Sequence, residues 1–307
     1  MIFFRCYGSL LKRLSVGMRK FWLVSTNHLE EGIWFRDDED FRVAMNFVAI
    51  QAASNPDVVV LAFILMSNHV HFMLYGCRED VLQFINAFKQ RYSLYLRRKY
   101  GNKEFLRGND VNLTLVPDEN ESLERAIAYV QMNCVAANIC SNPTQYQWGT
   151  GNLFFNPSKP SGKPIASLSV RARNRLLRSK SDCVPLEWLF CEEGYILPHS
   201  YTAVQTVETL YRNPKRMNYF LNTSSKAKKR VESTDEHLPA FRDQTILASL
   251  PDLYQSLFGK KTFSDLTSEE QTECVRQIRF RFSANVNQIA RVCGISYAQA
   301  ARLMEGL

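Results

Sequence analysis

The stretch that decides the fold is DVVVLAFILMSNHVHFMLY, residues 57–75. Residues 57–66 and 69–75 are rich in β-branched, aromatic and other apolar side chains, which is typical of strands. Between them stand Ser67 and Asn68, a pair that favours a turn. The sequence therefore predicts a β-hairpin at this point of the chain.

The segments on either side of the hairpin predict an α+β fold. In chain order we expect a strand at 20–29, a helix at 37–53, the hairpin, a helix at 81–99, a strand at 112–116 and a helix at 121–137. This order predicts a ferredoxin-like antiparallel sheet with helices on one face. No Gly-rich phosphate loop follows a strand in the sequence, which argues against a Rossmann fold.

Two polar stretches divide the rest of the chain. PSKPSGKP (157–164) and SSKAKKRVES (224–233) have the composition of linkers. We therefore expect three parts: a sheet domain at 18–157, a basic and mainly helical region at 158–233, and a helical domain at 238–307.

The composition indicates a folded cytoplasmic protein. Of the 307 residues, 46% are hydrophobic and 22% are charged, which excludes a disordered, collagen-like or coiled-coil chain. No apolar run reaches the roughly 18 residues that a membrane span requires, and the first residues lack the pattern of a secretion signal. The eight cysteines include no C-x-x-C pair, which favours reduced thiols over a disulfide framework or a zinc ribbon. We expect no membrane partner.

The positive charge is concentrated in the second half of the chain. Lys and Arg number 38 against 30 Asp and Glu, a net charge of +8. Residues 1–150 hold 16 of these cations and 15 of the anions, a net of +1, so residues 151–307 hold 22 and 15, a net of +7. Such an excess suits a polyanionic partner, although many basic proteins bind none.

Two pairs of side chains are candidates for a functional site. On the second strand of the hairpin, His69 and His71 project from one face with Val70 on the other, and two adjacent imidazoles are half of a divalent metal site. A surface pair that binds no metal is the alternative on spacing alone. On the helix expected at 121–137, Tyr129 and Asn133 are four residues apart and share a face. A core aromatic is the alternative for Tyr129, and a hydrogen bond to a backbone carbonyl is the alternative for Asn133.

Several stretches resemble the motifs of one known family. AFILMSNHVHFMLYG (62–76), AIAYVQMNCVAANIC (126–140) and TQYQWGTG (144–151) are similar, in content and in order, to motifs of the REP-associated tyrosine transposases. These are single-tyrosine HUH (His-hydrophobe-His) enzymes, and they are IS200-like. STNHLEEGIWFRDDEDF (25–41) resembles their first strand, loop and helix. The resemblance covers roughly residues 18–155 and identifies the sheet domain as an HUH domain.

The resemblance implies a metal-dependent transesterase that acts on single-stranded DNA. His69 and His71 would be ligands of Mg²⁺ or Mn²⁺, Asn133 a third ligand, and Tyr129 the nucleophile. The enzyme would nick and rejoin hairpins of repeated palindromic elements through a 5′-phosphotyrosine intermediate, as a transposase and strand transferase. Its partner would be single-stranded or hairpin DNA and its location the cytoplasm, in association with the nucleoid. A homodimer is one alternative for its assembly.

The alternative function is that of a domesticated protein that binds such hairpins without cutting them. The sequence also departs from the family pattern in two places. Cys134 follows Asn133 where the family usually has proline, and EFLRGND (104–110) stands in place of a more aromatic stretch. The second departure puts the DNA contacts of that loop, including Arg107, in doubt.

Basic residues on two helical segments are further candidates for contacts with DNA. Tyr92, in KQRYSLYLRRKY (89–100), is also the rival nucleophile, and a solvated basic helix is the alternative for this segment. Residues 285–307 are typical of a helix-turn-helix with Gly294 in the turn, for which a plain helical hairpin is the alternative. The residues predicted to bind DNA are Arg91, Tyr92, Arg97, Arg98, Arg107, Arg291 and Arg302.

Overall fold

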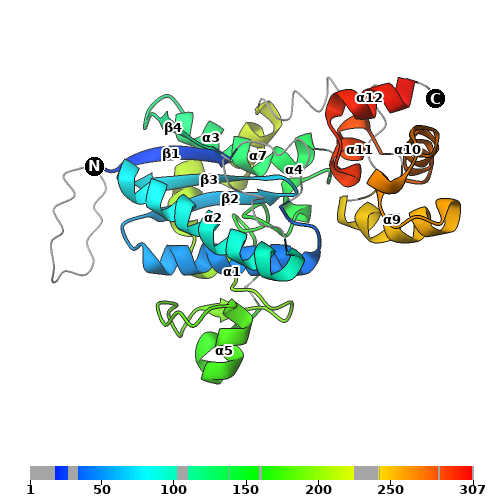
Figure 1. The fold of residues 1–307 in the computed structure, drawn as a ribbon. Coiled ribbons are helices and arrows are strands. Elements are labelled where there is room, and N and C mark those ends of the chain that lie inside the picture. Colours follow the sequence, from blue (N-terminus) through cyan, green and yellow to red (C-terminus); the bar gives the residue numbers. More distant parts are fainter. Residues whose placement is uncertain are drawn as a thin grey trace.

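The structure is a computed structural model in which two helical groups accompany one mixed α+β core (Figure 1). It describes residues 18–26, 34–101, 110–137, 139–158, 161–224, 241, 243–282 and 284–305. Arg107 lies outside these residues.

A four-stranded antiparallel sheet forms the centre of the α+β core. Its strands are β1 (Lys20–Thr26), β2 (Val59–Met66), β3 (His69–Gly76) and β4 (Val111–Val116). They lie in the order β2-β3-β1-β4, with every neighbouring pair antiparallel. This is the strand order of the ferredoxin-like βαββαβ arrangement. The predicted α+β class and the predicted hairpin at 57–75 are therefore confirmed.

Helices α1 (Asp38–Ser54) and α2 (Arg78–Tyr100) cover one face of the sheet. The ring of Phe72 on β3 packs against Phe84 and Phe88 of α2, with ring centroids 5.9 Å apart in both cases. The N-terminus of α1 is capped by Asp37, whose side chain accepts a hydrogen bond from the backbone N–H of Asp40 at 2.8 Å.

Helix α3 (Ser122–Gln131) lies over the opposite face. It brings Tyr129 against His71, and His71 points away from the side on which its strand neighbour Phe72 meets α2. The expectation that the helices lie on one face only is therefore wrong. The reason is visible in β3 itself, where seven of eight residues are buried. A strand covered on a single face would alternate between buried and exposed residues.

The outer edge of β2 is covered by two later segments of the chain. The backbone N–H of Leu65 donates to the Trp148 carbonyl, and that of Thr150 to the Phe63 carbonyl, at 2.9 and 3.0 Å. A Cβ atom on Gly149 would lie 2.6 Å from the Phe63 carbonyl oxygen, so this close approach requires glycine. Further along, the N–H of Ala203 donates to the carbonyl of Val60 at 2.9 Å. The edge of the sheet is thus protected from pairing with another chain.

The predicted boundary near residue 160 separates segments that share one hydrophobic core. Buried residues of the middle region, among them Ile165, Leu177, Ile196, Tyr211 and Phe220, belong to the same cluster as the sheet. The region holds α5 (Val170–Leu177), α6 (Val204–Tyr211) and α7 (Pro214–Thr223), as expected for a mainly helical segment, together with the short pair β5 (Lys163–Pro164) and β6 (Leu189–Phe190). The short helices η1 (Pro143–Gln145), η2 (Ile165–Ser167) and η3 (Pro198–Ser200) precede its longer elements.

The C-terminal helices have a hydrophobic core of their own. They are α9 (Asp243–Phe258), η4 (Phe263–Asp265), α10 (Ser268–Phe282), α11 (Val286–Cys293) and α12 (Tyr297–Glu305). Their buried side chains run from Ile246 to Ala300. One polar contact to the sheet unit is made by Gln244, whose side-chain amide donates to the Phe35 carbonyl at 2.8 Å. Among the described residues, no helix is long and apolar enough to cross a membrane, and the described cysteines form no disulfide with one another.

Candidate active site

The two histidines of the H-x-H motif lie side by side on β3. Both are only 4% exposed, and their ring centroids are 4.8 Å apart with the planes nearly perpendicular. Ile64 and Ser25, on the neighbouring strands, are the register partners of His71. Because β3 is an inner strand of the sheet, its backbone holds both imidazoles in fixed positions on one face.

Asn68 orients His69. Its side-chain oxygen lies 2.8 Å from Nδ1 of the imidazole, and an amide oxygen can only accept a hydrogen bond. Nδ1 therefore carries the hydrogen, and the lone pair is on Nε2, which is the arrangement that a metal-binding imidazole needs. The sequence indicated Asn68 only as a turn residue. Its position next to an H-x-H motif was the signal that could have identified this second role.

Tyr129, on α3, lies beside the histidines of β3. Its ring meets that of His71 edge-on, with centroids 5.6 Å apart and an interplanar angle of 86°. The side chain is half-buried, and this burial raises the pKa of the phenol above its usual value of 10. Since a neutral phenol is a weak nucleophile, the site would have to stabilise the phenolate during any attack by this oxygen.

Asn133 stands at the start of α4 (Asn133–Ala136), just after α3 ends. Its amide nitrogen donates to the carbonyls of Tyr129 and Val130, at 2.8 and 3.2 Å. The nitrogen of Asn133 therefore makes hydrogen bonds to backbone carbonyls, which was the alternative to metal binding for this residue. An asparagine binds metal through its oxygen, so the anchoring of the nitrogen fixes the orientation of the amide without using the coordinating atom.

The donor set fits a divalent transition metal better than it fits Mg²⁺. Among the described residues, no group of three or more His, Cys, Asp and Glu side chains could hold an ion. Two imidazoles are present, and the amide oxygen of Asn133 is the candidate third ligand. Imidazole ligands favour Mn²⁺ and other transition ions over Mg²⁺, which prefers oxygen.

Tyr92 is not a surface residue, so the prediction that it binds DNA is wrong and its burial argues against the alternative that it is the nucleophile. It is fully buried between α2 and the core, and its hydroxyl donates to the carbonyl of Trp34 at 2.5 Å. Burial, followed by the charge of Asp40, raises the pKa of this phenol far above its usual value. The aromatic ring of Tyr92 stands at a core-facing position of α2, and this position explains its burial in spite of the basic residues beside it in the sequence.

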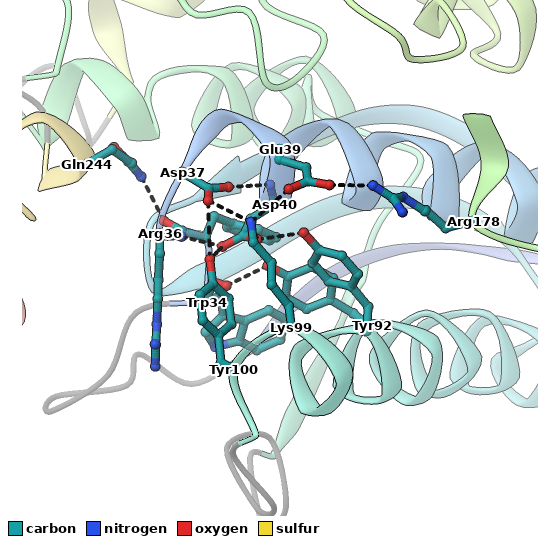
Figure 2. Close-up of polar contacts among 12 residues, drawn as sticks. Trp34, Arg36, Asp37, Glu39, Asp40, Tyr92, Lys99, Tyr100, Arg178 and Gln244 are labelled. Carbon is teal, nitrogen blue, oxygen red and sulfur yellow. Dashed lines mark hydrogen bonds and ion pairs between the residues drawn. The ribbon is translucent and has the colours of Figure 1, made fainter. Parts of the chain in front are cut away.

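Lys99, at the basic C-terminal end of α2, has a structural role. Lys99 lies among three carboxylates of the α1 N-terminus, at 2.6 Å from Asp37, 3.2 Å from Glu39 and 2.8 Å from Asp40 (Figure 2). Burial alone would lower the pKa of Lys99, but hydrogen bonds to Asp37 and Asp40 outweigh it and raise that pKa. Lys99 thus ties α2 to α1.

The remaining arginines predicted to bind DNA differ in their surroundings. Arg97 and Arg98 are exposed, and Arg91 is half-buried with its guanidinium 3.4 Å from the Ser179 hydroxyl. In the C-terminal helices, Arg302 is exposed, whereas Arg291 binds buried Asp243 through two hydrogen bonds of 2.7 and 3.2 Å. The guanidinium of Arg291 thus neutralises a buried carboxylate, and its contact with DNA stays a prediction.

Helices α11 and α12 are joined by a short turn at Gly294, as predicted. Gly294 ends α11 in the left-handed conformation with φ of 67°, and its N–H bonds to the Ala290 carbonyl. Tyr297, Gln299 and Arg302 of α12 are exposed. The helix-turn-helix arrangement is compatible with this geometry, but its DNA contacts stay a prediction.

Comparisons with known proteins found one family model and one solved structure that are similar to this chain. Residues 35–111 match the family model described as "Transposase IS200 like". A solved structure of a REP-associated tyrosine transposase bound to a REP hairpin is similar, at 10% identity and a TM-score of 0.35, over 50% of this chain and 84% of that chain. No curated protein matches the chain.

The matched residues extend from the end of the loop before α1 to the start of β4 and include His69 and His71. This part of the chain is similar to the IS200-like transposases.

Proposed function

We propose that the protein is a metal-dependent DNA strand transferase that nicks and rejoins single-stranded DNA through Tyr129. The observation that carries the proposal is the contact between Tyr129 and His71, with His69 at the next position on the same face. Three residues from two distant parts of the chain thus form one partly accessible cluster.

The candidate metal ligands are His69, His71 and the amide oxygen of Asn133. A bound Mn²⁺ or Mg²⁺ would withdraw negative charge from the scissile phosphate and lower the cost of forming the phenolate. Asn68 would keep His69 in the tautomer that presents Nε2.

The chemistry assigned to Tyr129 exchanges one phosphate ester for another. The phenol loses its proton to solvent, and its oxygen forms a bond to phosphorus as the bond from phosphorus to the 3′ oxygen breaks. The 3′ oxygen takes up a proton and leaves as the 3′-hydroxyl of the upstream segment, and the downstream segment stays on the protein through its 5′ phosphate as a phosphotyrosine. Attack by a 3′-hydroxyl reverses these steps, so rejoining needs no nucleotide cofactor.

Hairpins of repeated palindromic DNA are the substrate class that the motif resemblance favours. The net charge of +8 supports a polyanionic partner. One small sheet domain offers few base contacts, and we assign part of the recognition to the exposed face of α12.

The decisive experiment looks for a covalent adduct. Labelled single-stranded hairpin DNA is incubated with the protein and Mn²⁺, and a protein–DNA species is sought on a denaturing gel. Tyr129→Phe should abolish this species while DNA binding persists, because only one hydroxyl is lost. Tyr75→Phe is the matched control, a phenol on the same face of β3 at its far end from His69. Binding without any adduct from the wild-type protein would favour the non-cleaving alternative.

A further inference from the structure

A basic groove runs along the side of the molecule that α2 covers. One wall is a stripe of α2 at helical spacing, Arg91, Leu94, Tyr95 and Arg98. The other wall is the end of α5 and the turn after it, including Arg175 and Lys180. Glu39 and Phe47 of α1 line the floor, and Figure 1 shows α1 between α2 and α5.

The groove presents cations that protein carboxylates do not neutralise. Six cationic side chains line it, against the single carboxylate of Glu39. Two of the six are engaged, since Lys99 binds the acidic residues of α1 and Arg178 binds Glu39 (Figure 2). Within the described part of the chain, Arg98, Arg175 and Lys180 form no ion pair, and all three are exposed.

Such a groove selects an extended polyanion. Cations from two separate elements face a common channel, and their like charges repel one another unless an anion lies between them. A nucleic acid backbone supplies anionic phosphates at regular intervals along its length and releases condensed counterions when it binds. A single small anion would leave most of the channel uncompensated.

The groove is separate from the candidate active site. It lies on the face of the sheet where Phe72 meets α2, whereas His69, His71 and Tyr129 lie on the opposite face. DNA that occupies both must therefore extend around the domain, and a short oligonucleotide at the active site leaves the groove empty.

The geometry points to a second DNA-binding site, in which Arg98 of α2 and Arg175 and Lys180 of the α5 segment bind the phosphate backbone of DNA away from the point of cleavage. This inference rests on the proposed function for the identity of the polyanion as DNA. It adds that the middle region, through α5, supplies part of the binding surface.

The test is a charge reversal with a matched control. The variant combines Arg98→Glu, Arg175→Glu and Lys180→Glu, and the control combines Lys20→Glu, Arg78→Glu and Lys163→Glu. The control residues are exposed, lie outside the groove and change the net charge equally. Binding is measured at several salt concentrations with a hairpin that has a long single-stranded flank and with a minimal hairpin.

We expect the groove variant to lose at least about tenfold in affinity for the long DNA, and the slope of log K against log salt to fall by about 3. The control should change both far less. Adduct formation by the wild-type protein on the minimal hairpin is measured in parallel, which separates failure of this inference from failure of the proposed function. Equal salt slopes for groove variant and control would overturn the inference.

A crosslinking measurement keeps the inference testable if the charge reversal impairs folding. A photoreactive phenylalanine analogue in place of Leu94, which is 43% exposed in the groove, should crosslink to the long DNA. The same analogue at Leu186, 48% exposed outside it, should not. Equal crosslinking at the two positions, or none at Leu94, would contradict a DNA site in the groove.

Discussion

The imidazole of His71 meets the phenol of Tyr129 edge-on across the gap between β3 and α3, with ring centroids 5.6 Å apart. The two residues are far apart in the sequence, and the contact requires α3 to cross to the face of the sheet that α1 and α2 leave uncovered. This relationship places a phenol beside the H-x-H motif. The proposed function and the first prediction rest on it.

Removal of either imidazole should abolish the metal response. His69→Ala and His71→Ala should each lower adduct formation by about two orders of magnitude or more, because one of the few ligands is lost. EDTA should reproduce the loss in the wild-type protein, and added Mn²⁺ should restore it. Full adduct formation in EDTA would rule out the metal role.

Asn68 should tune the metal affinity through His69. Asn68→Ala removes the acceptor for Nδ1–H, and we expect Mn²⁺ to bind about 10 to 100 times more weakly. Asn68→Asp retains an acceptor oxygen and should bind Mn²⁺ much as the wild type does. Calorimetric titration of Mn²⁺ into the three proteins checks this, and equal affinities would leave Asn68 with a structural role only.

The cluster around Lys99 should contribute to stability in a pH-dependent way. Burial would raise the pKa of Asp37, but the hydrogen bonds from Lys99 and the Asp40 backbone outweigh it and lower that pKa. A carboxyl with a lowered pKa in the folded state stabilises the fold above its unfolded pKa of 3.8, and this contribution is lost as the pH falls through the folded value.

Lys99→Met should therefore reduce the free energy of unfolding at pH 7 by about 2 to 4 kcal/mol, because buried Asp40 loses a cation. Its melting temperature should also fall less than that of the wild type as the pH drops through the unfolded pKa of 3.8 toward the lower pKa of folded Asp37. Thermal unfolding of both proteins across this range measures the difference. Parallel curves would show that Lys99 does not set the pKa of Asp37.

Two arginines of the C-terminal helices should respond to substitution in opposite ways. Arg291→Ala leaves Asp243 buried with Gln288 as its one remaining side-chain partner among the described residues, so the free energy of unfolding should fall by about 3 kcal/mol. Arg302→Ala should leave stability unchanged but weaken DNA binding and reduce the salt slope by about 1. Thermal melts and binding isotherms on the same two variants separate these roles. Loss of DNA affinity per folded molecule in Arg291→Ala would reverse the assignment.

Truncation after Ser224 should leave the sheet unit folded, because its hydrophobic core ends at Leu221 and the C-terminal helices have their own. Ending the chain near residue 157 should instead be destabilising, since it removes Ile165, Ile196 and Tyr211 from that core. Circular dichroism melts of the two truncated proteins test this difference. Equal stability of both would show that the middle region is a separate domain.

The amino-acid sequence by itself determined the local elements of this protein and the residue types of its candidate site. The apolar run at 57–75 with its central turn pair predicts the hairpin, and alternation places His69 and His71 on one face. Helical spacing then pairs Tyr129 with Asn133. The predictions for the hairpin and for the two histidines are confirmed because each depends on chain neighbours only. The predicted helix at 121–137 is instead divided into α3, which ends at Gln131, and α4, which begins at Asn133.

Only the tertiary structure decided which face each helix covers and which charged residues are engaged. Tyr92 stands among basic residues in the sequence but lies in the core, and Lys99 and Arg291 bind carboxylates of distant segments. The basic groove likewise joins α2 to α5, which lie on opposite sides of α1. Burial and charge pairing depend on the neighbours that folding brings together, and no local pattern in the chain contains that information.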